Sequence, residues 1–115
     1  MKFKTAERLQ RTAEVCEVKL PESEYYWGVG KNEECLECLD DFVVENSWNL
    51  EKVMFPDFTT DELLKWLPID IIIWRDSKEK YFAKRDGYDE NFSGKSPSEA
   101  LAELAIILIK KGILK

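Results

Sequence analysis

Two cysteines lie three positions apart, at Cys35 and Cys38, in a spacing that zinc sites and thiol–disulfide enzymes both use. A structural zinc ion needs four ligands, and Cys16 is the only cysteine left to join the pair. Four of the six other residues from Glu33 to Asp40 are carboxylates, and their negative charge disfavours the reactive thiolate. We therefore expect Cys35 and Cys38 to share the buried face of a helix, without a metal or redox role.

A second group of possible ligands surrounds Gly87. Its oxygen-bearing residues are Asp86, Asp89, Glu90 and Asn91. Their order departs from the calcium-binding loop of EF-hands, and no acidic residue stands at the twelfth position that such a loop requires. Aspartate, asparagine and glycine are also the residues that tight turns favour. We interpret the group as a turn and predict no metal site here.

Histidine is absent from all 115 residues, and this excludes more chemistry than any motif supports. Catalytic triads of the Ser-His-Asp type, Cys-His nucleophiles and histidine-ligated metals are all removed. Neighbouring carboxylates such as Asp40 and Asp41 point in different directions on a helix, which does not suit paired acid–base catalysis. The chain also has no glycine-rich loop of the kind that cradles phosphates. A small hydrolase or transferase is therefore disfavoured, and we expect a protein with no catalytic residue and no cofactor.

The net charge of −6, from 17 Lys and Arg against 23 Asp and Glu, is unevenly distributed. It lies entirely in the residues up to Phe58, because the acids and bases beyond that position cancel. No basic residue falls between Lys31 and Lys52, whereas seven acids do: Glu33, Glu34, Glu37, Asp40, Asp41, Glu45 and Glu51. Such a chain repels phosphate backbones on average, unless its basic residues cluster on one face. We expect no direct nucleic-acid partner.

The acidic segment is the candidate contact surface for a protein partner whose identity is unknown. Concentrated negative charge steers association with a basic protein, and Trp48, in a polar stretch, is the tryptophan best suited to anchor it. The predicted partner-binding residues are Glu33, Glu34, Glu37, Asp40, Asp41 and Trp48. Two other roles stay open: an acidic mimic of nucleic acid that inhibits a host nuclease or regulator, and a structural homo-oligomer. A solvated acidic face is the alternative that carries no function.

The length accommodates one domain, over residues 1–115, and 44% hydrophobic residues are enough to build its core. A domain of this size favours surface grooves over deep pockets. Three cysteines are too few, and odd in number, for a secreted disulfide framework. The charged start has no signal-peptide pattern, and the longest strongly apolar run, Leu104 to Ile109, is too short to span a membrane. These features predict a protein of the cytoplasm, with reduced thiols and no membrane contact.

Three elements are expected in the first half of the chain. The spacing of Ala6, Leu9 and Ala13 predicts an amphipathic helix over residues 5–13. Alternating apolar residues predict a strand over 15–20, which Pro21 ends, and the aromatic run at 25–29 predicts its hairpin partner. Within the acidic segment, helical spacing predicts a short helix that contains Cys35, Leu36, Leu39, Phe42 and Val43.

A short helix and a three-stranded meander should follow. The sequence Thr59 to Glu62 fits a capping box and predicts a helix that begins at Thr60 and ends before Pro68. Strands are expected at 69–75, 81–84 and 88–92, joined by polar turns at 76–79 and 86–87. The predicted core side chains of this region are Leu63, Leu64, Leu67, Trp66 and Trp74.

The most complete helix signal starts at Ser96, with proline at the first helical position and Glu99 at the third. Gly112 is placed to end this helix. Its wide apolar stripe consists of Leu101, Leu104, Ala105, Ile107 and Leu108. The predicted fold class is therefore α+β: a small, mostly antiparallel sheet with the C-terminal helix packed across one face and shorter helices at its edge.

Several capping and core positions of the second half resemble a known group of proteins. They are Phe55 to Thr59, the leucines that end in Leu67-Pro68, the run Ala100 to Leu104, and Gly112 to Leu114. In this pattern, over about the last 60 residues, the chain resembles small uncharacterised proteins encoded in phages and prophages of gut bacteria. The resemblance implies a phage-type accessory protein of α+β fold in the bacterial cytoplasm. It implies no catalytic residues, since that group has no assigned activity.

Overall fold

The computed structural model describes residues 1–29, 34–38 and 54–114, and it confirms the α+β class. The described helices are α1 (Phe3–Val15), α3 (Thr60–Trp66) and α4 (Pro97–Lys110). The described strands are β1 (Tyr25–Val29), β2 (Glu34–Cys38), β3 (Met54–Pro56), β4 (Ile71–Ser77), β5 (Lys80–Arg85) and β6 (Asn91–Gly94).

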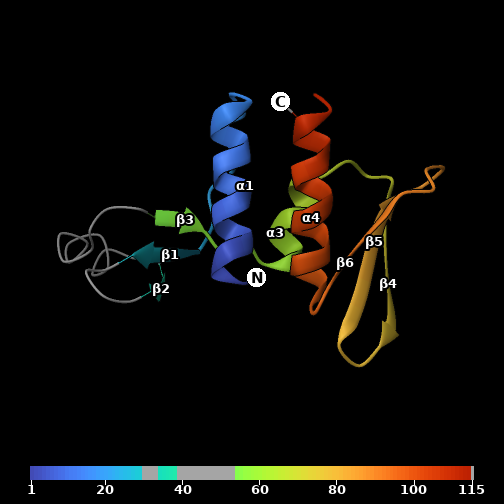
Figure 1. Cartoon of the computed structure of the whole chain (residues 1–115), viewed down its shortest axis with the longest axis horizontal. Helices are drawn as coiled ribbons and strands as arrows, with labels where there is room; N and C mark the ends of the chain where they lie inside the picture. The colour runs from blue at the N-terminus through green and yellow to red at the C-terminus, as the bar shows by residue number, and fades with distance from the viewer. Residues whose placement is uncertain (30–33, 39–53, 115) are drawn as a thin grey trace.

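Helices α1 and α4 lie side by side at the centre of the molecule, and a small antiparallel sheet flanks each of them (Figure 1). Strands β2-β1-β3 form the sheet on the α1 side, and β4-β5-β6 form the sheet on the α4 side. Helix α4 packs across β5 and β6, and α3 packs against α4. The core therefore forms around α4, whose buried face is almost continuous from Ser98 to Ile109.

Helix α1 buries its three predicted apolar residues, Ala6, Leu9 and Ala13, but it runs on to Val15 and leaves no strand at 15–20. The predicted strand is wrong because the chain closes the helix with a Schellman motif. The amide of Val18 donates to the carbonyl of Ala13 over 2.8 Å, and Glu17 takes a left-handed φ of 57°. The alternating apolar residues thus belong to a helix end.

Strand β1 is confirmed, but its predicted hairpin partner is wrong. It pairs antiparallel with β2 on one side, where Trp27 stands opposite Leu36, and with β3 on the other, where Trp27 stands opposite Phe55. The predicted acidic helix is also wrong over Glu34–Cys38, which is strand β2. Residues 34–38 pair with β1, whose residues favour strands. The backbone hydrogen bonds of this pairing outweigh the helical spacing of the apolar residues in the acidic segment. The predicted helix positions Leu39, Phe42 and Val43 lie outside the described residues.

Helix α3 begins and ends as predicted. The side chain of Thr59 accepts from the amide of Glu62, and the carboxylate of Glu62 accepts from the amide of Thr59, over 3.2 and 2.9 Å. Leu63 and Leu67 are buried, whereas the predicted core residue Leu64 is 40% exposed. A helix of seven residues that packs on one neighbour buries a single narrow stripe, and Leu64 lies beside that stripe.

The meander β4-β5-β6 is confirmed, with both pairs antiparallel. Its first strand starts at Ile71, because Ile69 lies in a turn and is fully exposed. Its third strand starts at Asn91 rather than at Tyr88, since the Asp86-Gly87 turn continues to Tyr88, whose amide donates to the carbonyl of Arg85 over 3.1 Å. Gly87 has a φ of +85°, which suits glycine.

Helix α4 starts at Pro97, with the Ser96 side chain accepting from the amide of Glu99 over 3.2 Å. The carboxylate of Glu99 does not return to Ser96. It accepts hydrogen bonds from the amide of Lys2 and, over 2.7 Å, from the hydroxyl of Thr5. Glu99 is only 7% exposed, so one buried side chain ties the start of the first helix to the start of the last.

We expect Glu99→Ala to lower the free energy of unfolding by about 2–3 kcal/mol, because it leaves the amide of Lys2 and the hydroxyl of Thr5 without their buried acceptor. Urea denaturation measures the loss. The matched control is Glu103→Ala one turn along α4, which removes only an ion pair with the exposed Arg8 and should cost less than about 1 kcal/mol. Equal costs for the two variants would contradict the role given to Glu99.

Candidate functional site

The structure places two of the six predicted partner-binding residues. Glu34 and Glu37 lie on β2, opposite Val29 and Tyr26 of β1. Strand β2 is at the edge of its sheet, on the side of α1 that faces away from α4 (Figure 1). The other four predicted residues, Glu33, Asp40, Asp41 and Trp48, lie outside the described residues.

The predicted helix that would carry the cysteine pair is wrong, since Cys35 and Cys38 stand on strand β2 opposite Gly28 and Tyr25. Cys16 is exposed at the end of α1. Within the described ranges, no three Cys, Asp or Glu side chains come close enough together to hold a metal ion. None of the helices in these ranges has the length and hydropathy of a membrane-spanning segment.

Two tryptophans predicted for the core have different positions. Trp66 is half-buried against the core and stacks on Phe58, with 6.2 Å between ring centroids. Trp74 is 37% exposed, so its predicted core position is wrong. Alternate residues of a strand face opposite sides, and on β4 Ile71 and Ile73 contact the core beneath α4. Trp74 therefore lies on the opposite face of the sheet.

This opposite face is the first candidate surface, and we name it the outer sheet face. No other helix or strand of the described chain packs on it. Trp74 stands directly opposite Phe82 on β5, and their rings stack at 5.3 Å and 14°. The outer sheet face consists of Ile72, Trp74, Lys80, Phe82, Lys84, Asn91 and Ser93.

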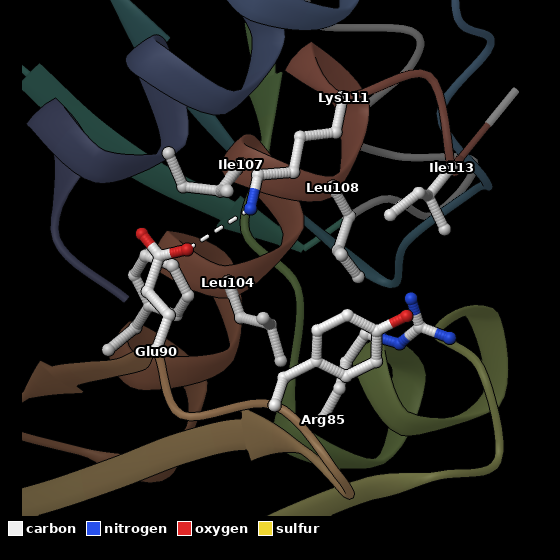
Figure 2. Close-up of a pocket in the computed structure, with 9 residues that line it drawn as sticks. Arg85, Glu90, Leu104, Ile107, Leu108, Lys111 and Ile113 are labelled. Atoms are coloured by element: carbon white, nitrogen blue, oxygen red, sulfur yellow. Dashed lines mark hydrogen bonds and ion pairs between the residues drawn. The ribbon is translucent and has the colours of Figure 1, made fainter.

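The second candidate surface is a small hollow between the C-terminal half of α4 and the ends of β5 and β6. We name it the α4 hollow, and its volume is about 50 Å³ (Figure 2). Leu104, Leu108 and Phe92 form its apolar floor, while Tyr88 and Ile113 stand exposed on its rim. The remaining lining residues are Arg85, Glu90, Ile107 and Lys111.

Each cation of the α4 hollow has an acidic partner. The ammonium of Lys111 donates to Glu90 over 3.1 Å, and this bond spans the rim in Figure 2. The guanidinium of Arg85 donates twice to one oxygen of Asp70, at 3.1 and 3.3 Å, and lies 4.7 Å from the ring centroid of Tyr88. The charged side chains around the α4 hollow are thus neutralised by acidic partners, while the floor is apolar.

The dimensions of the α4 hollow limit what it can bind. A pocket for a cofactor or a drug-sized molecule measures about 300–1,000 Å³, whereas this one has room for a few atoms. An aliphatic side chain of a partner fits that size.

One titratable pair lies apart from both surfaces. Asp61 accepts a hydrogen bond from Lys65, four residues later on α3, over 3.0 Å, and this contact raises the pKa of Lys65. Neither residue lines the α4 hollow or belongs to the outer sheet face. The pair is exposed and is the kind of surface ion pair that contributes little to stability.

Sequence reasoning missed both surfaces for identifiable reasons. The run from Ile71 to Trp74 is apolar at every position, so alternation alone could not show which residues face outward. The α4 hollow combines two segments that are adjacent only in the folded chain, namely residues 85–92 and 104–113.

Comparison with models of known protein families, with curated proteins and with solved structures found no match to this chain.

Proposed function

We propose that this chain is a non-catalytic protein-interaction module whose α4 hollow receives an apolar side chain of the partner. The observation that carries the proposal is the combination of an apolar floor with paired charges around it, of which Figure 2 shows the pair Lys111 and Glu90. Interfaces concentrate their binding energy where one side chain fills a pocket and polar neighbours exclude water. Tyr88 and Ile113, exposed beside the floor, extend the contact area.

Binding is favoured over catalysis by the same geometry. An active site needs a reactive group together with space for a substrate beside it. In the α4 hollow, Arg85, Glu90 and Lys111 are engaged in ion pairs, and the space is smaller than a substrate pocket. We further propose that the protein acts in the bacterial cytoplasm as a phage or prophage accessory, on the grounds of the cysteine usage and the resemblance described above.

The rim residue Ile113 gives the sharpest test. It is 42% exposed, so Ile113→Asp should leave the fold intact while placing a charge beside the apolar floor. We expect a partner captured from host lysate by the native chain to be retained at least about 30-fold more weakly by this variant, as is typical of a contact worth about 2 kcal/mol. Quantitative affinity capture at fixed salt measures the effect.

The control is Ile69→Asp, the same substitution at a fully exposed isoleucine that does not line the α4 hollow. Unfolding curves of both variants verify that each is folded. Equal retention of the partner by the two variants would overturn the α4 hollow as the contact. A native chain that captures only copies of itself would instead identify a homo-oligomer.

The acidic residues predicted from the sequence form a separate part of the proposal. Reversing Glu33, Glu34, Glu37, Asp40 and Asp41 to lysine should abolish salt-sensitive capture of a basic partner, because clustered charge steers association. The control changes five acids elsewhere in the chain to lysine, which gives the same net charge; all five are exposed: Glu17, Glu22, Glu24, Asp76 and Asp86. Similar losses in both variants would assign the effect to net charge alone and remove the acidic segment as a specific surface. Capture of a nuclease or a nucleic-acid regulator would favour the mimic role.

A further inference from the structure

The outer sheet face combines aromatic and basic side chains in a regular order. Along β5 the outward-facing residues are Lys80, Phe82 and Lys84, and Trp74 stacks against Phe82 from the neighbouring strand. Alternate residues of a strand are about 6.6 Å apart, so the two lysines flank the aromatic pair over a span of about 13 Å. The ammonium of Lys80 lies 5.2 Å from the ring centroid of Phe82. The face thus presents a cation, a ring stack and a second cation in a row.

A third cation extends this row at the end of β6. Lys95 and Lys80 border an open groove of about 370 Å³, together with Ser77, Ser93, Gly94 and Glu79. Lys80, Lys84 and Lys95 form no ion pair with any described residue, unlike Arg85 and Lys111 of the α4 hollow. Three lysines without an acidic partner in the described chain therefore surround the aromatic stack.

This arrangement selects among possible partners by chemistry. Phosphates suit the unpaired lysines, and the flat face of a nucleobase suits the exposed indole of Trp74. An acidic peptide supplies negative charge for the lysines but no flat ring to stack on Trp74. In a duplex the bases stack on one another, so their flat faces cannot reach the indole. The excess of acidic residues is confined to residues up to Phe58. Strand β2, which belongs to that acidic part of the chain, lies on the side of α1 that faces away from the sheet β4-β5-β6 (Figure 1).

We propose that the outer sheet face binds single-stranded nucleic acid, without sequence preference. A base stacks on Trp74, which Phe82 supports from its other side, and phosphates contact Lys80 and Lys84 of this face and Lys95 beside it. The clustering of lysines on one face is the condition under which an acidic chain can still bind phosphates. This activity is independent of the α4 hollow, which lies on the other face of the same sheet.

The test is fluorescence anisotropy with labelled twelve-residue oligo-dT and oligo-U at several salt concentrations. Three phosphate contacts predict that the logarithm of the association constant falls with the logarithm of salt with a slope of about −2. We expect dissociation constants of about 1–100 µM at physiological salt, and tighter binding as the salt concentration falls. The variant Lys80→Ala/Lys84→Ala should weaken binding at least about 10-fold and reduce the slope to about −0.7. Both lysines are on the surface of the sheet, so the fold should tolerate their loss.

Trp74→Leu tests the stacking contribution and should weaken binding about 5- to 100-fold with an unchanged salt slope. The control variant, Lys65→Ala/Lys110→Ala, removes two exposed lysines outside the outer sheet face and should bind as the native chain does.

No binding at the lowest salt, or the same loss in the control variant, would overturn the proposal. Equal binding of a twelve-residue poly-Glu peptide would identify an acidic peptide as the partner instead, and equal binding of a duplex would contradict stacking. None of these outcomes bears on the capture of a protein partner by the α4 hollow, which Ile113→Asp tests separately.

Discussion

Leu63→Ala should lower the free energy of unfolding by about 3 kcal/mol, while the identical change one residue later, Leu64→Ala, should lower it by less than about 1 kcal/mol. Leu63 is fully buried on the stripe of α3 that packs against α4, and removing its methyl groups leaves a cavity in the core. Leu64 is 40% exposed, so water already contacts much of its side chain. Urea denaturation of the two variants under one set of conditions measures the difference.

The pair Leu63 and Leu64 is its own control, because both substitutions change the helix propensity of α3 by the same amount. The difference between them therefore reports burial alone. If Leu64→Ala cost as much as Leu63→Ala, the placement of α3 against α4 would be wrong. Such a result would restore the wider leucine stripe that the sequence predicts.

Gly94→Ala should lower the free energy of unfolding by about 3 kcal/mol, although Gly94 is the last residue of β6 and is only half-buried. A Cβ at this position would stand 2.4 Å from the Cβ of Glu99 and 2.8 Å from the backbone nitrogen of Ala100. The obstacle is the first turn of α4 itself, which cannot move without disturbing the buried carboxylate of Glu99. Thermal or urea denaturation measures the loss.

The comparison variant is Gly87→Ala. Gly87 has a φ of +85° and open space where a Cβ would lie, so alanine there causes only backbone strain, worth about 1 kcal/mol. A smaller cost at Gly94 than at Gly87 would show that β6 does not approach α4 as closely as described. The two glycines thus separate steric contact from conformational strain.

The parts of the fold that were predictable from the sequence are those with local chemistry. The helix starts at Thr59 and Ser96 depend on side chains that bond to amides three residues away, and both starts are confirmed. The Asp86-Gly87 turn likewise depends on neighbouring residues alone, because Gly87 supplies the positive φ that the turn needs. Strand pairing is not local: β1 takes its partners from β2 and β3, and nothing in residues 25–29 specifies either. The end of α1 was missed because a left-handed Glu17 is unusual for a residue with a Cβ.

The candidate surfaces were less predictable than the fold. The charge count identified the acidic segment, but only two of its predicted contact residues, Glu34 and Glu37, have a described position. The exposure of Trp74 depends on which face of β4 is covered by α4, and that is decided by tertiary packing. The pairing of Lys111 with Glu90 closes the rim of the α4 hollow across 21 positions of sequence. Spacing along the chain contains no sign of such contacts.

The contact of Glu99 with Lys2 and Thr5 joins residues more than 90 positions apart, and it has a consequence for synthesis on the ribosome. A nascent chain still lacking residues 97–110 has no surface on which α1 and α3 can bury Leu9 and Leu63. Contacts between distant residues form only after the intervening chain has been made, so we expect α1 and α3 to reach their native positions only after residues 97–110 have been synthesised. Every copy that terminates before residue 97 would expose the same apolar side chains, which makes such fragments natural substrates for the chaperones and proteases of the cell.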